Sequence, residues 1–249
     1  GNLVNVAASL SNYGMALTKA QKWSESEQAF EESLKTLEGT PLKGLWNPDA
    51  VRLAVQCNLS ELYRHQDRYK DAKALLDKAI VTAESQERLR LVPPILLATA
   101  RVLMGLNQVT EAHEFARRAL QVSEDLGITT NIADAYVCQA WCLIHEGKKE
   151  EGIAQLQEAV RWSRATGSVE LFVESLYCLI YAKPDMETSL IAQCTGVGGK
   201  LRPGALGHLV KWQREKLKKY EASTTDQSSE IDSLEHPEIE ALVQKLSLG

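Results

Sequence analysis

Few side chains in this sequence have the spacing that catalysis or metal binding requires. The five histidines are scattered, and no two of them stand at the spacing of a metal-ligand pair. Cys138 and Cys142 share one helical face, but no histidine pair lies near them to complete a site. The five cysteines form an odd set without a CxxC pair. We therefore expect no metal, and free thiols buried as small hydrophobic groups, which is typical of an intracellular, cytoplasmic protein.

Residues 194–201 resemble a phosphate-binding loop only in part. Cys194 stands where GxxxxGK[ST] needs its first glycine, and Leu201 stands where it needs serine or threonine. No strand precedes the segment, so we interpret it as a linker. Nothing in the chain resembles a nucleophile elbow or a catalytic triad. The sequence thus predicts no cofactor, and a binding protein is favoured over an enzyme.

Composition and charge exclude further classes of function. The chain has 249 residues, 44% of them hydrophobic, and a formal net charge of −5. Lys and Arg dominate residues 200–220 and Asp and Glu dominate 221–249, so the rest of the chain has no basic stripe that would follow nucleic acid. No run approaches the length of a membrane span. Because the chain begins Gly1-Asn2 without Met, we expect it to be part of a larger protein or complex.

The elements that carry these residues are indicated by small side chains that recur at fixed intervals. Gly14, Ser60, Ala100 and Ala140 lie 46, 40 and 40 positions apart. Two more series keep the same spacing: Ser26, Ala72, Ala112 and Gly152, and Ser33, Ala79, Ala119 and Ala159. One two-helix unit is therefore used four times, which predicts an all-α solenoid. We expect the small residues to lie where two helices cross closely.

Each unit reads as a helix A, a polar turn and a helix B. In the second unit, apolar residues recur with helical spacing over 50–65 and again over 69–84. Gly127 and Gly167 stand just past the helix B of the third and fourth units, where helices prefer a glycine cap. A fifth helix A is predicted over 169–182.

Beyond these units the pattern changes. We expect the repeat array to span 1–182, about four and a half units, and to form a right-handed superhelix. A linker and a basic helix are predicted over 183–222, forming a divergent C-terminal helical cap. Residues 223–249 read as a flexible acidic tail with a short amphipathic helix. That helix has the pattern of a segment that docks, either on the array itself or on a partner.

The repeated residues resemble the tetratricopeptide repeat. The second unit carries its pattern at Leu59-Ser60, Tyr63, Tyr69, Ala72, Leu76 and Ala79-Ile80, and the first at Tyr13-Gly14, Leu17, Trp23, Ser26, Phe30 and Ser33-Leu34. The third unit is looser, with Ala116 at the family's inward Phe position and Phe115 beside it. The period of 40 exceeds the usual length of about 34 residues. The chain is therefore similar to kinesin light chain repeats or MalT-like arrays, whereas armadillo and HEAT repeats have other signatures.

The resemblance implies a concave groove lined by helix A. By register the lining residues are Ser11, Asn12, Met15, Asn58, Glu61, His65, Leu97, Arg101, Asp134, Cys138 and Trp141. In arrays similar to kinesin light chain, an Asn at the position shared by Asn12 and Asn58 bonds the backbone of an extended peptide. The alternative is that both are ordinary solvated or helix-packing amides. A carboxylate clamp is rejected, because its cationic positions here hold Ser11, Pro94 and Ala98.

The sequence therefore favours a protein-interaction scaffold or adaptor. Its partner would be another protein, which places a peptide or helical segment in the groove. The alternative is a regulatory sensor array of the MalT kind, which binds a small ligand or a neighbouring domain.

Overall fold

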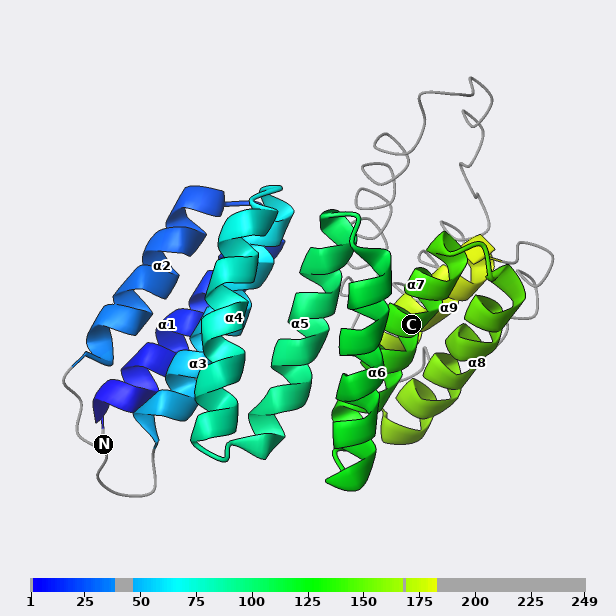
Figure 1. Ribbon diagram of the computed structural model, residues 1–249. Helices are drawn as coiled ribbons and strands as arrows, with labels where there is room; N and C mark the ends of the chain where they lie inside the picture. Colours follow the sequence, from blue (N-terminus) through cyan, green and yellow to red (C-terminus); the bar gives the residue numbers. More distant parts are fainter. Residues whose placement is uncertain (1, 39–46, 168, 183–249) are drawn as a thin grey trace, which may run out of the picture. The chain divides into compact units, whose positions relative to one another are not determined.

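A computed structural model describes residues 2–38, 47–167 and 169–182, and these are helical throughout apart from short turns (Figure 1). No strand occurs among them. The helices are α1 (Asn2–Lys19), α2 (Trp23–Thr36), α3 (Pro48–His65), α4 (Tyr69–Ser85), α5 (Val92–Gly105), α6 (Val109–Asp125), α7 (Ile132–His145), α8 (Lys149–Thr166) and α9 (Val169–Ala182), with short 3₁₀ helices η1 (Leu89–Leu91) and η2 (Thr129–Asn131). The predicted all-α class is confirmed.

The helices pack as a repeating pair, as the sequence predicts. Within each unit helix A packs on helix B, so that α1 contacts α2, α3 contacts α4 and α5 contacts α6. Each helix B then packs on the next helix A, which brings α2 onto α3, α4 onto α5 and α6 onto α7. The A helices α1, α3, α5 and α7 also contact one another in chain order (Figure 1). This is the arrangement of a helical solenoid.

The chain divides into two compact units, residues 1–155 and 156–249. Helices α1 to α7 belong to the first unit, α8 crosses the boundary, and α9 belongs to the second. The predicted linker, basic helix and acidic tail beyond residue 182 lie outside the described residues, as does the predicted loop around 39–46. These predictions therefore stay predictions.

The small residues lie at close helix crossings. Ser60, Ala100 and Ala140 are all fully buried. A Cβ added at Gly14 would lie 2.8 Å from the ring of Phe30, and one added at Gly152 would lie 2.9 Å from the carbonyl oxygen of Ala140. Even a methyl group would force the Phe30 ring or the Ala140 backbone to move, so the predicted role of the small residues is confirmed.

Serine replaces alanine in the first unit, and its hydroxyl is satisfied by the neighbouring helix. The Oγ of Ser26 donates to the carbonyl oxygen of Gly14 at 2.8 Å, and that of Ser33 donates to the carbonyl oxygen of Ala7 at 2.7 Å. A buried polar group costs stability only when it is left unpaired. The serines therefore add interhelical hydrogen bonds without opening the crossing.

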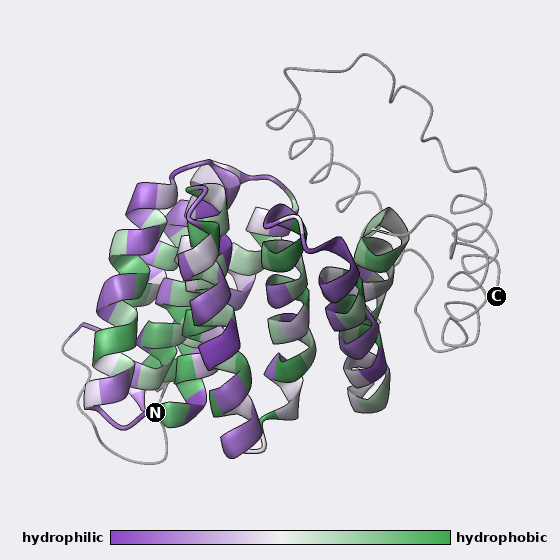
Figure 2. Cartoon of the chain, turned by 45° about the vertical axis from the view of Figure 1, so that its right-hand side comes forward, coloured by the Kyte–Doolittle hydropathy of each residue, from purple (hydrophilic) through white to green (hydrophobic). Residues whose placement is uncertain are grey.

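Hydrophobic and hydrophilic residues alternate around the helices, so the ribbons carry green and purple bands (Figure 2). The inward position of helix B shows the hydrophobic side most clearly. In the four successive units this position is occupied by Phe30, Leu76, Ala116 and Leu156, all with no exposed surface. Phe115, beside the small Ala116, is partly buried and packs against the core cluster that contains Ala116. Tertiary packing of this apolar stripe is what holds the short helices in place.

The turns between helices repeat one backbone conformation. Gln21, Asp67, Asn107 and Gly147 share a repeat position between helix A and helix B, and all have φ between 59° and 79°. Glu87, Gly127 and Gly167 share the position after helix B, with φ between 54° and 70°. The predicted glycine caps at Gly127 and Gly167 are confirmed.

The two residue types at this second position give a matched test. Gly127→Ala should lower the free energy of unfolding by about 1 kcal/mol, because a Cβ disfavours the left-handed conformation. Glu87→Gly should be neutral or raise stability by up to about 1 kcal/mol, because it removes that strain but loosens the unfolded chain. Urea denaturation measures both, and equal effects of the two substitutions would contradict the account.

Candidate partner-binding surface

One repeat position on the A helices is partly exposed in every unit. It holds Met15, Glu61, Arg101 and Trp141, on α1, α3, α5 and α7, at the same 46, 40 and 40 spacing. Each of these side chains is half-buried. The four helices contact one another in chain order. These residues therefore follow one another across the A helices of the compact unit 1–155. We call this set the A-helix row.

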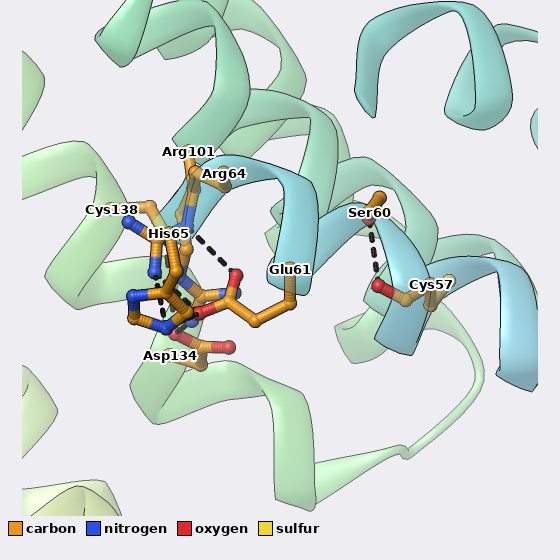
Figure 3. A network of polar contacts seen from close by, with 8 residues as sticks. All are labelled: Cys57, Ser60, Glu61, Arg64, His65, Arg101, Asp134 and Cys138. Carbon is orange, nitrogen blue, oxygen red and sulfur yellow. Dashed lines mark hydrogen bonds and ion pairs between the residues drawn. The ribbon is translucent and has the colours of Figure 1, made fainter. Parts of the chain in front are cut away.

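Glu61 is held by Arg64 and His65 from the last turn of its own helix (Figure 3). The Nε of Arg64 donates to Glu61 Oε2 at 2.8 Å, and its Nη2 donates to Oε1. The Nε2 of His65 lies 3.3 Å from Glu61 Oε1. Arg64 is buried, whereas the Glu61 side chain is 25% exposed, so the carboxylate is the member of the pair that solvent reaches.

These contacts set the charge of Glu61. Burial by itself would raise the pKa of its carboxyl group. The charge of Arg64 and hydrogen bonds from Arg64 and His65 outweigh burial, and the charge of Arg101 on α5 adds to them, so the pKa lies well below its usual value. Glu61 is therefore ionised at neutral pH. The ring of His65 stacks on that of Trp23 of α2, with the ring centroids 6.0 Å apart. This contact from α2 holds His65 in position.

A second ion pair joins the next two A helices. The Nη2 of Arg101 on α5 donates to Oδ1 of Asp134 on α7 (Figure 3). The two side chains are 29% and 17% exposed. Glu61, Arg101 and Asp134 thus place a negative, a positive and a negative group on three consecutive A helices. Such alternation can recognise a partner that carries both signs of charge, or polar backbone groups.

The two asparagines predicted to bind backbone differ in environment. Asn58 Nδ2 donates to the Oγ of Ser11 at 3.0 Å, which ties α3 to α1. Ser11 is buried, and the amide nitrogen of Asn58 thus packs helices, as in the alternative interpretation. Asn12 is exposed on α1. Of the pair, Asn12 is the amide that a partner would reach from solvent.

Two further residues assigned to the groove are not accessible. Leu97 is 1% exposed and Cys138 is 8% exposed, and both belong to the hydrophobic core. Their placement in a groove was wrong, because adjacent A helices pack directly on one another and bury whatever lies between them. Conversely, Arg64 was not predicted. Its only signal in the sequence is a position three residues after Glu61, the spacing of a helical ion pair.

Burial keeps two of the thiols among the described residues in their protonated form. The four cysteines among them are free thiols. Burial raises the pKa of Cys57 to about 12, and burial with the charge of Glu146 raises that of Cys142 to about 12, so neither is a thiolate at neutral pH. The same residues hold no cluster of three metal-ligating side chains. None of the helices that the structure describes is long and apolar enough to cross a membrane.

Comparison with a family model decides the class of the repeat. Residues 6–39 and 52–85 match the model of the tetratricopeptide repeat. The chain carries tetratricopeptide repeats over these residues. Each matched stretch of this tetratricopeptide protein has the ordinary length of the motif, and the extra residues of its period fall between the matches. The matches cover the two units with the strongest signature in the sequence.

Solved structures share the tetratricopeptide arrangement at low sequence identity. Aspartyl phosphate phosphatase F from Bacillus subtilis is 15% identical with a TM-score of 0.62, and the match covers 98% of this chain and 60% of that one. The TPR-like repeats of a putative kinesin light chain from Podosopora anserina are 17% identical (TM-score 0.54, covering 80% and 97%). PlcR from Bacillus thuringiensis, solved with the peptide PapR7 and DNA, is 12% identical (TM-score 0.58, covering 89% and 74%).

The tetratricopeptide chain thus spans about three fifths of the length of the phosphatase that it resembles. No curated protein matches it in sequence. At these identities the structural likeness concerns the fold alone.

Proposed function

We propose that this tetratricopeptide protein is an interaction scaffold that binds a peptide or helical segment of a partner protein on its A-helix row. The observation that carries the proposal is the alternation of charge between Glu61 and Arg101 of the row and Asp134, which pairs with Arg101 from the next A helix; each is partly open to solvent. Met15 and Trp141 extend the row at either end with large apolar side chains. Aromatic and Arg side chains of this kind are the usual anchors of protein interfaces.

The comparisons support binding rather than catalysis. PlcR, whose fold is similar, was solved with a bound peptide. One of the other similar structures is named a phosphatase, yet the thiols whose pKa is raised here are not activated nucleophiles. A partner that binds the A-helix row would contact charged side chains that already form ion pairs within the chain. An incoming carboxylate would compete with Asp134 for Arg101, so binding would depend on the exchange of ion pairs.

The test begins by identifying a partner through affinity capture and mass spectrometry. Calorimetry of the purified pair then compares the native chain with Arg101→Gln. We expect binding to weaken by roughly tenfold or more, because truncating an interfacial charge leaves its partner group unpaired. Arg117→Gln is the matched control, since Arg117 is an exposed arginine on α6 that pairs with Glu114 of the same helix. Asn12→Ala should weaken binding without changing thermal stability.

Equal affinity of the native chain, Arg101→Gln and Asn12→Ala for the captured partner would move the site away from the A-helix row. Circular dichroism of the variants separates loss of binding from loss of folding. That result would contradict the position of the binding site but not the proposed scaffold function.

A further inference from the structure

The ion pair between Arg101 of α5 and Asp134 of α7 uses only one of the two carboxylate oxygens. Arg101 Nη2 donates to Asp134 Oδ1, and the Sγ of Cys138 lies 4.0 Å from the same oxygen. The other oxygen, Oδ2, makes no hydrogen bond to the side chains drawn in Figure 3 or to any other residue that the structure describes. The two side chains are 29% and 17% exposed. Solvent therefore reaches a cation and an anion that lie side by side.

Glu61, the carboxylate on the α3 side of Arg101, is bound differently. Both of its oxygens accept hydrogen bonds from Arg64, whose side chain is only 6% exposed. A partner that displaced Arg64 would leave a buried guanidinium without its counter-charge, which is costly. The charge of Arg101 nevertheless helps to lower the pKa of Glu61, so the two groups interact. The ion pair that a partner can open is thus the one between Arg101 and Asp134.

A partner segment with one sign of charge gains little at this pair. A carboxylate that takes Arg101 leaves Asp134, which is mostly covered by protein, without its counter-charge. A lone cation at Asp134 Oδ2 is repelled by the guanidinium of Arg101 next to it. A segment that carries both signs replaces one ion pair with two and leaves no charge unpaired. The pair therefore favours a segment that is itself dipolar.

We propose that the A-helix row selects a partner segment with an acidic and a basic side chain close together, the acid binding Arg101 and the base binding Asp134. These two residues lie on the packed helices α5 and α7, and the axes of packed helices are about 8–10 Å apart. In an extended segment, side chains two or three positions apart span about 7–10 Å. The two charged residues of the partner are therefore separated by one or two others. This inference rests on the proposed function, because it specifies the partner of the same surface.

Selection from a displayed library of random peptides tests the inference without a known partner. Peptides of about twelve residues are long enough, when extended, to cross the four A helices. The native chain is the bait, and selected peptides that bind a Trp141→Ala chain more weakly are taken as ligands of the row. We expect these ligands to be enriched in an Asp or Glu and a Lys or Arg separated by one or two residues. Calorimetry should show that Arg101→Gln and Asp134→Asn each weaken their binding roughly tenfold.

The two variants, used as baits, should each select ligands of a single sign. Arg101→Gln leaves Asp134 as the open charge, so basic peptides should be enriched. Asp134→Asn leaves Arg101 as the open charge, so acidic peptides should be enriched. Arg117→Gln and Glu114→Gln are the matched controls, because they make the same charge changes in an exposed ion pair on α6, and both should still select peptides of both signs. Circular dichroism checks that each variant is folded.

The outcomes separate this inference from the function on which it rests. Ligands of the row that carry one sign of charge, or neither, when selected on the native chain would overturn the inference and leave the scaffold function standing. The same holds if the native chain, Arg101→Gln and Asp134→Asn all select the same peptides. If no selected peptide depends on Trp141, the proposed function is contradicted, and the inference is contradicted with it.

Discussion

Replacing Phe30 with alanine should lower the free energy of unfolding by about 3–5 kcal/mol. Phe30 has no exposed surface, and its ring lies against Gly14 on one side and the core of α3 on the other. Its removal leaves a cavity at the centre of the first repeat junction, and the surrounding helices can only partly close it. The loss should therefore approach the upper end of what single core substitutions cost.

Urea denaturation followed by circular dichroism measures the effect. Val81→Ala is the matched control, because Val81 is a hydrophobic residue that is 64% exposed on α4 and should change stability by less than about 0.5 kcal/mol. Gly14→Ala should partly mimic Phe30→Ala, since its methyl group would push the same ring. A Phe30→Ala variant as stable as Val81→Ala would show that the predicted junction is not formed in solution.

Arg64→Ala should be the second severe substitution, with a loss of about 3 kcal/mol. Arg64 is buried and makes two hydrogen bonds to Glu61. Removing it leaves a largely desolvated carboxylate without its main counter-charge. The exposed quarter of the Glu61 side chain reduces this cost, so we place the effect at the low end of the range for buried pairs.

The effect has a defined dependence on pH. Since the pKa of Glu61 is lowered in the folded chain, its ion pair stabilises the native state above the pKa of the unfolded state. That stability is lost as pH falls through the folded pKa. The difference in unfolding free energy between the native chain and Arg64→Ala should therefore shrink as the solution is acidified below about pH 4.

A double variant separates the charge from the packing. Glu61→Gln combined with Arg64→Ala should recover part of the stability that Arg64→Ala loses, because no uncompensated charge remains. A difference that stays constant from neutral to acidic pH, with no recovery in the double variant, would assign the role of Arg64 to the packing of its alkyl chain.

The repeat register follows from the sequence alone. Alternation of helix A and helix B imposes a fixed spacing on the residues at each crossing, and only small side chains fit there. The series through Gly14 and Ser26 therefore predicted both the number of helices in the array and their close contacts. Position within the repeat also predicted Glu61, Arg101 and Trp141 as one surface, because equivalent positions on stacked helices must follow one another.

The identity of the contacts between units could not be read in the same way. Arg101 and Asp134 are 33 residues apart, and nothing local indicates that the next helix brings them together. Asn12 and Asn58 share a repeat position, yet Asn12 is exposed, whereas Asn58 bonds Ser11 of α1, the A helix that precedes its own. Leu97 was predicted to be exposed but is buried, because the neighbouring A helices α3 and α7 pack against α5.

Sequence alone determined the class of the repeat, its register and the length of its helices, since these follow from local periodicity and from the size of single side chains. Tertiary structure alone decided which of the registered residues remain open. Burial depends on the neighbour in space, and in a solenoid that neighbour is the adjacent unit. The contrast between exposed Tyr13 and buried Leu59, two residues at one repeat position, is set by the presence of α2 before α3 and of no described helix before α1.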